Sequence, residues 1–120
     1  MRNAKMKVEQ VIYMLRAQDM ERAIAFYGEV IGLNVRTQSP EWSELTFGDA
    51  VVALHGGGTR EYKETGLSIQ VSDIQQACEE VVSGGGQLRS GPTDRPGEPI
   101  KLAHLSDTEG NGFTFIQVVG

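Results

Sequence analysis

Residues 19–33, DMERAIAFYGEVIGL, decide how the first half of the chain folds. After Asp19, apolar residues recur every three or four positions, which is the spacing of the buried face of a helix. Asp19 is suited to accept hydrogen bonds from the first free backbone N–H groups, and Gly32 can adopt the left-handed conformation that ends many helices. The stretch therefore predicts an amphipathic helix of about three turns.

The same pattern begins again 54 residues later, at Asp73. Ala23 of the first pattern corresponds to Ala77 of the second, and three consecutive glycines follow where the second helix should end. Gln76 is placed to close a capping box with Asp73. We expect a second helix built like the first.

Strand candidates surround both helices in the same order. The candidates are residues 11–16, 34–37, 42–47 and 50–55 in the first half, and 67–71, 87–90, 100–105 and 113–118 in the second. A strand, a helix and three strands, written twice, predict an α+β fold of two βαβββ modules that share one core.

The length of 120 residues suits a single domain. Its predicted parts are module one at about 8–56, a connector at about 57–65 and module two at about 66–119. Residues 91–99 hold three of the four prolines and are expected to form a long loop, either a partial lid or a plain surface connection.

Alternation along the strands assigns side chains to two faces of each sheet. The residues expected to lie under the helices are Leu45, Phe47, Val52, Leu54, Phe113 and Phe115. Trp42 falls on the opposite face with several polar residues, and an aromatic residue there favours the lining of a cleft over a solvated sheet.

Two motifs carry a resemblance to a known family. Residues 11–35 resemble the opening module of the glyoxalase/bleomycin-resistance/extradiol-dioxygenase (vicinal oxygen chelate) superfamily. The usual sequence of that module is close to D-L-x-x-A-x-x-F-Y-x-x-x-L-G. Residues 105–113, LSDTEGNGF, resemble its closing turn, D-P-D-G-N before the last strand, with Thr108 in place of the usual proline. The resemblance implies a cup-shaped mixed sheet, commonly in a homodimer, with modules paired inside one chain or exchanged between two.

Metal-using members of this superfamily place one His, Gln or Glu ligand on each of four strands. Counting from the motifs puts these positions at Ile12, Ala53, Gly66 and Thr114. None of these side chains is a useful metal ligand, so the resemblance implies a member without metal or other cofactor.

The composition of the chain argues against nucleic acid and membranes as binding partners. Eleven Lys and Arg residues against 16 Asp and Glu give a net charge of −5, which lacks the footprint of a nucleic-acid or anionic-membrane surface. No apolar run approaches the roughly 20 residues that span a bilayer, and the N-terminus lacks the apolar core of a secretory signal. We therefore expect a cytoplasmic protein, and the single Cys78 is expected to pack in a helix.

The leading functional hypothesis is a small-molecule (antibiotic or metabolite) binding protein resembling bleomycin-resistance proteins, with its ligand in the cleft between modules of a homodimer. The candidate ligand-binding residues are Met14, Trp42, Glu44, His55, Ser68, Gln70, His104 and Thr114. The acidic composition would suit a cationic ligand.

An enzyme of the lyase or dioxygenase type is the alternative, with catalytic residues unassigned. It would need a displaced metal held by Glu44, His55 and His104, or acid/base chemistry by Glu44 after burial beside Trp42 raises its pKa. A dimerising module without a ligand is a third hypothesis.

Overall fold

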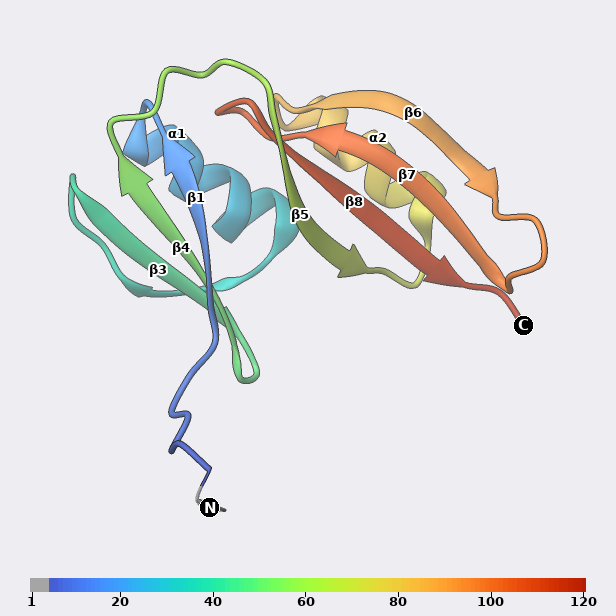
Figure 1. Ribbon diagram of the computed structural model, residues 1–120. Coiled ribbons are helices and arrows are strands. Elements are labelled where there is room, and N and C mark those ends of the chain that lie inside the picture. The colour runs from blue at the N-terminus through green and yellow to red at the C-terminus, as the bar shows by residue number, and fades with distance from the viewer. Residues whose placement is uncertain (1–4) are drawn as a thin grey trace.

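Each half of the chain folds as one βαβββ module in the computed structural model, which describes residues 5–120 (Figure 1). Module one contains β1 (Ile12–Ala17), α1 (Met20–Ala25), the π-helix η1 (Phe26–Ile31), β2 (Asn34–Thr37), β3 (Trp42–Phe47) and β4 (Ala50–Gly56). Module two contains β5 (Lys63–Gln70), α2 (Ile74–Ser83), β6 (Gln87–Asp94), β7 (Ile100–Ser106) and β8 (Asn111–Val118). The predicted order of elements is confirmed.

The eight strands form two four-stranded mixed sheets. Their orders are β1-β4-β3-β2, called sheet one, and β5-β8-β7-β6, called sheet two. In each module the first strand pairs in parallel with the last, and the other neighbours are antiparallel. The predicted α+β fold with a repeated module is therefore confirmed.

The first helical segment has the ends that the sequence predicts. The Asp19 side chain accepts a hydrogen bond from the Arg22 backbone N–H at 3.1 Å, and Gly32 ends the segment with φ +95°. The helix changes from α to π geometry at Phe26, so the predicted single helix is a continuous α1–η1 pair.

The second helix also begins at its aspartate. Asp73 accepts from the backbone N–H of Gln76 at 3.1 Å. The other half of the predicted capping box is wrong, because the Gln76 side-chain amide donates instead to Glu80, one turn along the helix, at 3.1 Å. The cap therefore satisfies one free donor of α2.

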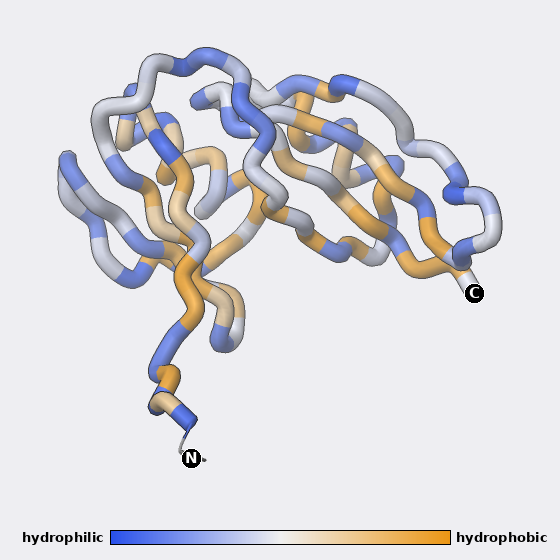
Figure 2. The backbone as a smooth tube through the Cα atoms, in the orientation of Figure 1, coloured by the Kyte–Doolittle hydropathy of each residue, from blue (hydrophilic) through white to orange (hydrophobic). Residues whose placement is uncertain are grey.

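The helices of both modules cover the same side of the two sheets and close one core. Figure 1 shows α1 and α2 behind their sheets, and α2 also packs against η1. The largest buried apolar side chains of this core are Leu15, Phe26, Tyr27, Leu45, Leu54, Ile74, Val81, Leu105 and Phe115. Phe26 joins the modules, since its ring centroid lies 6.2 Å from that of Phe113. The connector between β4 and β5 is polar (Figure 2).

The loop predicted at residues 91–99 is shorter in the structure than the sequence suggests. Strand β6 continues to Asp94, and Thr93 pairs with Leu102 of β7. Register shifts on both sides of Ser90 let the strand pass Pro92 and then resume pairing. Only residues 95–99 remain as a turn between β6 and β7.

A loop of module two, residues 107–111, is bonded into module one, and we call it the interlock loop. Tyr27 donates its hydroxyl hydrogen to the Asp107 carboxylate at 2.6 Å. The Asn111 amide donates to the Arg16 carbonyl at 2.8 Å. These bonds fix the β7–β8 turn against β1 and the first helix.

Glu109 is the deepest anchor of the interlock loop. Its side chain is fully buried and accepts hydrogen bonds from the backbone N–H groups of Gln18 and Asp19, both at 2.9 Å. Arg22 donates its Nε hydrogen to the same carboxylate at 2.7 Å, and Thr108 donates at 2.8 Å. Burial by itself would raise the pKa of Glu109, but these donors together lower it.

None of the helices in residues 5–120 is long and apolar enough to cross a bilayer.

We predict that Glu109→Gln lowers the free energy of unfolding by about 2 kcal/mol near neutral pH, because the substitution removes charge-assisted hydrogen bonds. Since the folded-state pKa of Glu109 lies below its ordinary value of 4.5, the carboxylate stabilises the fold above that pH. This stabilisation is lost as the pH falls through the lowered pKa. Urea unfolding followed by circular dichroism should show the difference between the two proteins shrinking below pH 4.5.

Glu98→Gln is the matched control, because the Arg95–Glu98 pair is half exposed on both sides. It should change stability by under about 1 kcal/mol at any of these pH values. Equal losses in the two variants would contradict the anchoring role of Glu109.

Candidate functional site

The side of the two sheets that faces away from the helices carries the predicted site residues, and we call it the open face. On sheet one, Met14 of β1, Ala53 of β4 and Glu44 of β3 form one row across the strands. Arg16, His55 and Trp42 form the next row. Four of the predicted residues, Met14, Trp42, Glu44 and His55, are therefore brought together.

Glu44 joins Trp42 to a basic residue on β2. One carboxylate oxygen accepts from the Trp42 indole N–H at 2.9 Å, and the other accepts from the Arg36 guanidinium at 2.8 and 3.0 Å. The hydrogen bond from Trp42, followed by that from Arg36, lowers the pKa of Glu44. The expected rise in its pKa is wrong, because the indole presents its donor edge to the carboxylate. Glu44 is thus a poor general acid or base near neutral pH.

His55 continues the same surface on the other side of Trp42. Its ring meets the Trp42 ring edge to face, with centroids 6.0 Å apart. His55 Nδ1 lies 3.1 Å from Arg16 Nη1 and 2.7 Å from the Gly56 carbonyl oxygen. Because a carbonyl oxygen only accepts, His55 Nδ1 donates to Gly56, and this bond fixes the imidazole beside Trp42. Trp42 thus presents an aromatic surface with Arg36 beyond Glu44 on one side and Arg16 beyond His55 on the other.

Sheet two presents a row of polar residues on its part of the open face. Ser68 of β5, Thr114 of β8 and His104 of β7 are aligned across the strands. Thr114 donates its hydroxyl hydrogen to Ser68 at 2.8 Å. Gln70 belongs to the next row. The predicted residues of module two are therefore neighbours, but on a different sheet from Trp42.

The positions implied for metal ligands do not fit a metal ion. Ile12 and Ala53 offer no donor atom, and Gly66 lies at an irregularity of β5 with φ +82°. The Thr114 hydroxyl is engaged with Ser68. A divalent ion at these positions would lack the imidazole and carboxylate ligands that it needs.

The displaced metal site is not assembled within one chain. Glu44 and His55 belong to sheet one and His104 to sheet two. Among residues 5–120, no three His, Cys, Asp or Glu side chains are grouped closely enough to hold a metal ion.

An apolar cavity of about 460 Å³ lies between the modules, and Trp42 is not part of its lining. Its lining includes Leu33 after η1, Ile69 of β5 and Val81 of α2, with Ser68 and Gln70 among its polar residues. The lining also includes the aromatic residues Phe47 and Phe115 and one charged residue, Glu80, but no arginine or tryptophan of the open face.

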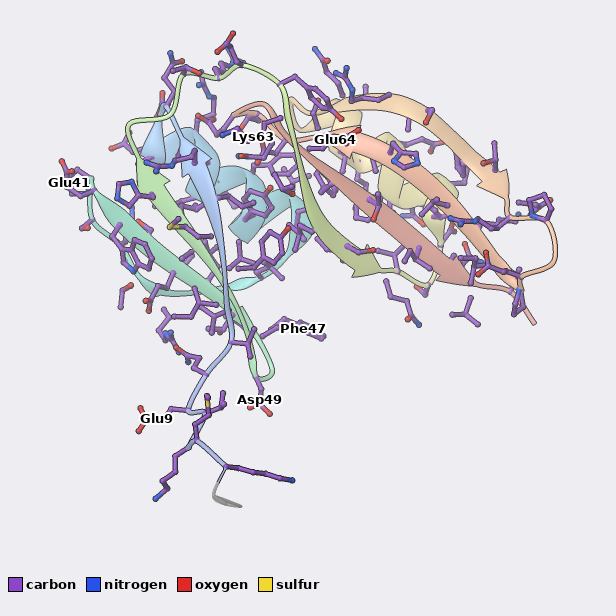
Figure 3. All side chains as sticks on the ribbon, in the orientation of Figure 1. Glu9, Glu41, Phe47, Asp49, Lys63 and Glu64 are labelled. Atoms are coloured by element: carbon purple, nitrogen blue, oxygen red, sulfur yellow. The ribbon has the colours of Figure 1, made fainter. Side chains whose placement is uncertain are left out.

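Phe47 also lines this cavity, which corrects its predicted place in the core. It is 71% exposed because it ends β3, beside the turn to β4 and beyond the cover of the helices. Figure 3 shows its side chain pointing from the β3–β4 hairpin toward module two. The other five residues predicted under the helices are buried.

Two basic residues of the open face, Arg16 and Arg36, were missed from the sequence. Arg16 lies two positions after Met14, so strand alternation alone would have placed it on the same face. Arg36 was harder to find, because a register shift between Val35 and Thr37 interrupts the alternation of β2.

A repeated βαβββ module with an open sheet face defines a class of small two-module α+β proteins. Residues 10–115 match the family model of the Glyoxalase/Bleomycin resistance protein/Dioxygenase superfamily, and the chain belongs to this superfamily.

Individual relatives agree with this assignment. A probable lactoylglutathione lyase of Vibrio cholerae is 27% identical over 119 residues, which cover 87% of this chain and 86% of the relative. A glyoxalase/bleomycin resistance protein/dioxygenase family enzyme of Burkholderia phytofirmans has a similar structure, with a TM-score of 0.76 and 17% identity, covering 90% of this chain and 97% of the other. TnmS3, an antibiotic binding protein of a Streptomyces species, aligns with a TM-score of 0.73 and 22% identity, covering 95% and 99%.

We predict that tag-free protein, incubated with Ni²⁺ or Zn²⁺ and then dialysed, retains no stoichiometric metal, because the four implied positions lack suitable donors. Elemental analysis before and after incubation measures this. A stoichiometric ion that survives dialysis would contradict the prediction, and its loss in Glu44→Gln or His55→Ala would then locate it on the open face.

Proposed function

We propose that this protein binds a small molecule, an antibiotic or a metabolite, against the open face, with Trp42 as the main aromatic contact. The observation that carries the proposal is the fixed Trp42 ring, held by Glu44 on one side and by His55 on the other. A rigid aromatic side chain flanked by polar groups is typical of small-molecule sites. The description of TnmS3 as an antibiotic binding protein supports the proposal at the level of a shared fold.

The proposed cleft needs a second wall, and we propose that a second copy of the chain supplies it. Ile12 and Met14 on the open face are 43% and 49% exposed in the single chain. Neighbouring apolar side chains of this kind are commonly covered by a partner. In a homodimer, sheet two of the partner would face sheet one and bring its row of polar residues opposite Trp42.

The alternative function is a glyoxalase-type reaction, which the description of the Vibrio cholerae relative as a probable lactoylglutathione lyase favours. The residues at three of the four implied metal positions argue against this reaction, because Ile12, Ala53 and Gly66 have no side-chain atom that could bind a metal ion. The lowered pKa of Glu44 also counts against metal-free acid/base chemistry. Binding therefore agrees best with the site.

We predict that Trp42→Ala weakens ligand binding by about tenfold or more, because ring stacking and apolar contact are lost together. Trp42 is the single tryptophan, so a compound library can be screened by the change in its fluorescence, and hits can be measured on both proteins by calorimetry. Phe47→Ala is the control, since this exposed aromatic lies outside the open face. An equal loss in both variants would contradict binding at Trp42.

We further predict that the chain is a dimer in solution and that Met14→Glu shifts it toward monomer, since a charge would be buried in the proposed interface. Sedimentation velocity over a range of concentrations measures the shift. Val82→Glu should leave the dimer intact, because Val82 is 52% exposed on α2, on the other side of the molecule. A monomeric wild type would rule out the proposed cleft between two chains.

A further inference from the structure

We propose that the ligand of the open face is a flat aromatic molecule with an acidic group, and that Arg16 binds the acid while Trp42 contacts the ring. This inference rests on the proposed binding function and adds the chemical class of the ligand. It reverses the expectation of a cationic ligand that the net charge of −5 suggests.

Glu44, the acidic residue that contacts the Trp42 ring, is already paired with a base. Both oxygens of Glu44 are occupied, one by the Trp42 indole N–H and the other by the Arg36 guanidinium. The Arg36–Glu44 pair therefore contributes little net charge to the open face. A cationic ligand would have to displace Arg36 to reach the carboxylate.

Arg16 has no such partner. Its side chain is exposed on the open face, and among residues 5–120 it takes part in no ion pair. Its Nη1 lies 3.1 Å from His55 Nδ1, and no carboxylate among the described residues pairs with the guanidinium. The remaining N–H groups are free to bind a carboxylate or phosphate in the paired geometry that arginine favours.

The geometry places this cation beside the aromatic surface. Arg16, His55 and Trp42 occupy neighbouring positions on β1, β4 and β3, and His55 lies between the other two. Adjacent strands in a sheet are about 4.8 Å apart, so Arg16 and Trp42 are separated by roughly two strand spacings. That span matches a fused aromatic ring with an acidic substituent at its edge.

The surroundings of Arg16 do not add negative charge. A cavity of about 370 Å³ between β1 and β5 is lined by Met14 and Arg16 and by Lys63 and Glu64, whose charges offset each other. On sheet two the aligned residues Ser68, Thr114 and His104 offer hydroxyl and imidazole groups. In the proposed dimer the Ser68 hydroxyl, which accepts from Thr114, would be free to donate its own hydrogen to an anion.

Three of the acidic residues that contribute to the net charge lie away from the open face. Glu29, Glu79 and Glu80 are exposed on η1 and α2, behind the sheets, and line a shallow hollow there. Local charge near a site governs ligand preference more than net charge does, because exposed charges are screened within about 10 Å. The open face is thus a locally basic surface on an acidic protein.

Three matched probes test the assignment: 2-naphthoate, 2-naphthamide and 2-naphthylmethylammonium, which share one ring system and differ in charge. Binding is measured by Trp42 fluorescence and confirmed by calorimetry. We expect the naphthoate to bind at least about tenfold more tightly than the amide, and the ammonium to bind most weakly. Arg16→Gln should abolish the preference for the acid while the amide binds as before.

Arg95→Gln is the control, because Arg95 is a half-exposed arginine paired with Glu98 at the far end of sheet two. It should keep the full preference. Equal or tighter binding of the amide or the ammonium, or a preference that persists in Arg16→Gln, would overturn the acidic-ligand assignment and leave the binding function intact. Failure of all three probes to bind would count against both this inference and an aromatic-binding role for Trp42.

Discussion

The buried carboxylate of Glu109 is the constraint on which the arrangement of the two modules depends. Within residues 5–120 no strand of one sheet pairs with a strand of the other, so the modules are not joined by a backbone ladder. A buried carboxylate is tolerated only when donors surround it, and here the donors come from the backbone at Gln18 and Asp19 and from Arg22 of the other module. The charge is therefore satisfied only when both modules are correctly placed.

The interlock loop also reaches the open face through the backbone of β1. Asn111 donates to the Arg16 carbonyl at 2.8 Å and contacts the Arg16 N–H at 3.5 Å through its own side-chain oxygen. The interlock loop thus holds the backbone of Arg16, whose side chain extends onto the open face. Positioning of the guanidinium and packing of the modules depend on the same contacts.

The sequence predicted features that depend on neighbouring residues. The caps at Asp19 and Asp73 and the left-handed Gly32 follow from positions within a few residues of each other. Strand alternation likewise placed Val52 and Leu54 in the core. The features that the sequence did not predict depend on distant parts of the chain or on irregular strand pairing. The hydrogen bonds of Glu109 join residues about 90 positions apart, and the register shift in β2 hides the face on which Arg36 lies. The sequence also suggested a raised pKa for Glu44, whereas the structure lowers it. Whether the pKa rises or falls depends on the N–H groups that point at the carboxylate, and not on the presence of an aromatic ring nearby.

The residues at the implied metal positions change what the open face can do. Ala53 is completely buried between Met14 and Glu44 in the same row, and Ile12 adds an apolar side chain on β1. The exposed apolar side chains beside it, Ile12 and Met14, give a surface on which a flat molecule can lie. The charged side chains Arg16, Arg36 and Glu44 lie at its margin. Under the proposed binding function, an apolar surface with a basic margin would select ligands by their shape and by the position of an acidic group.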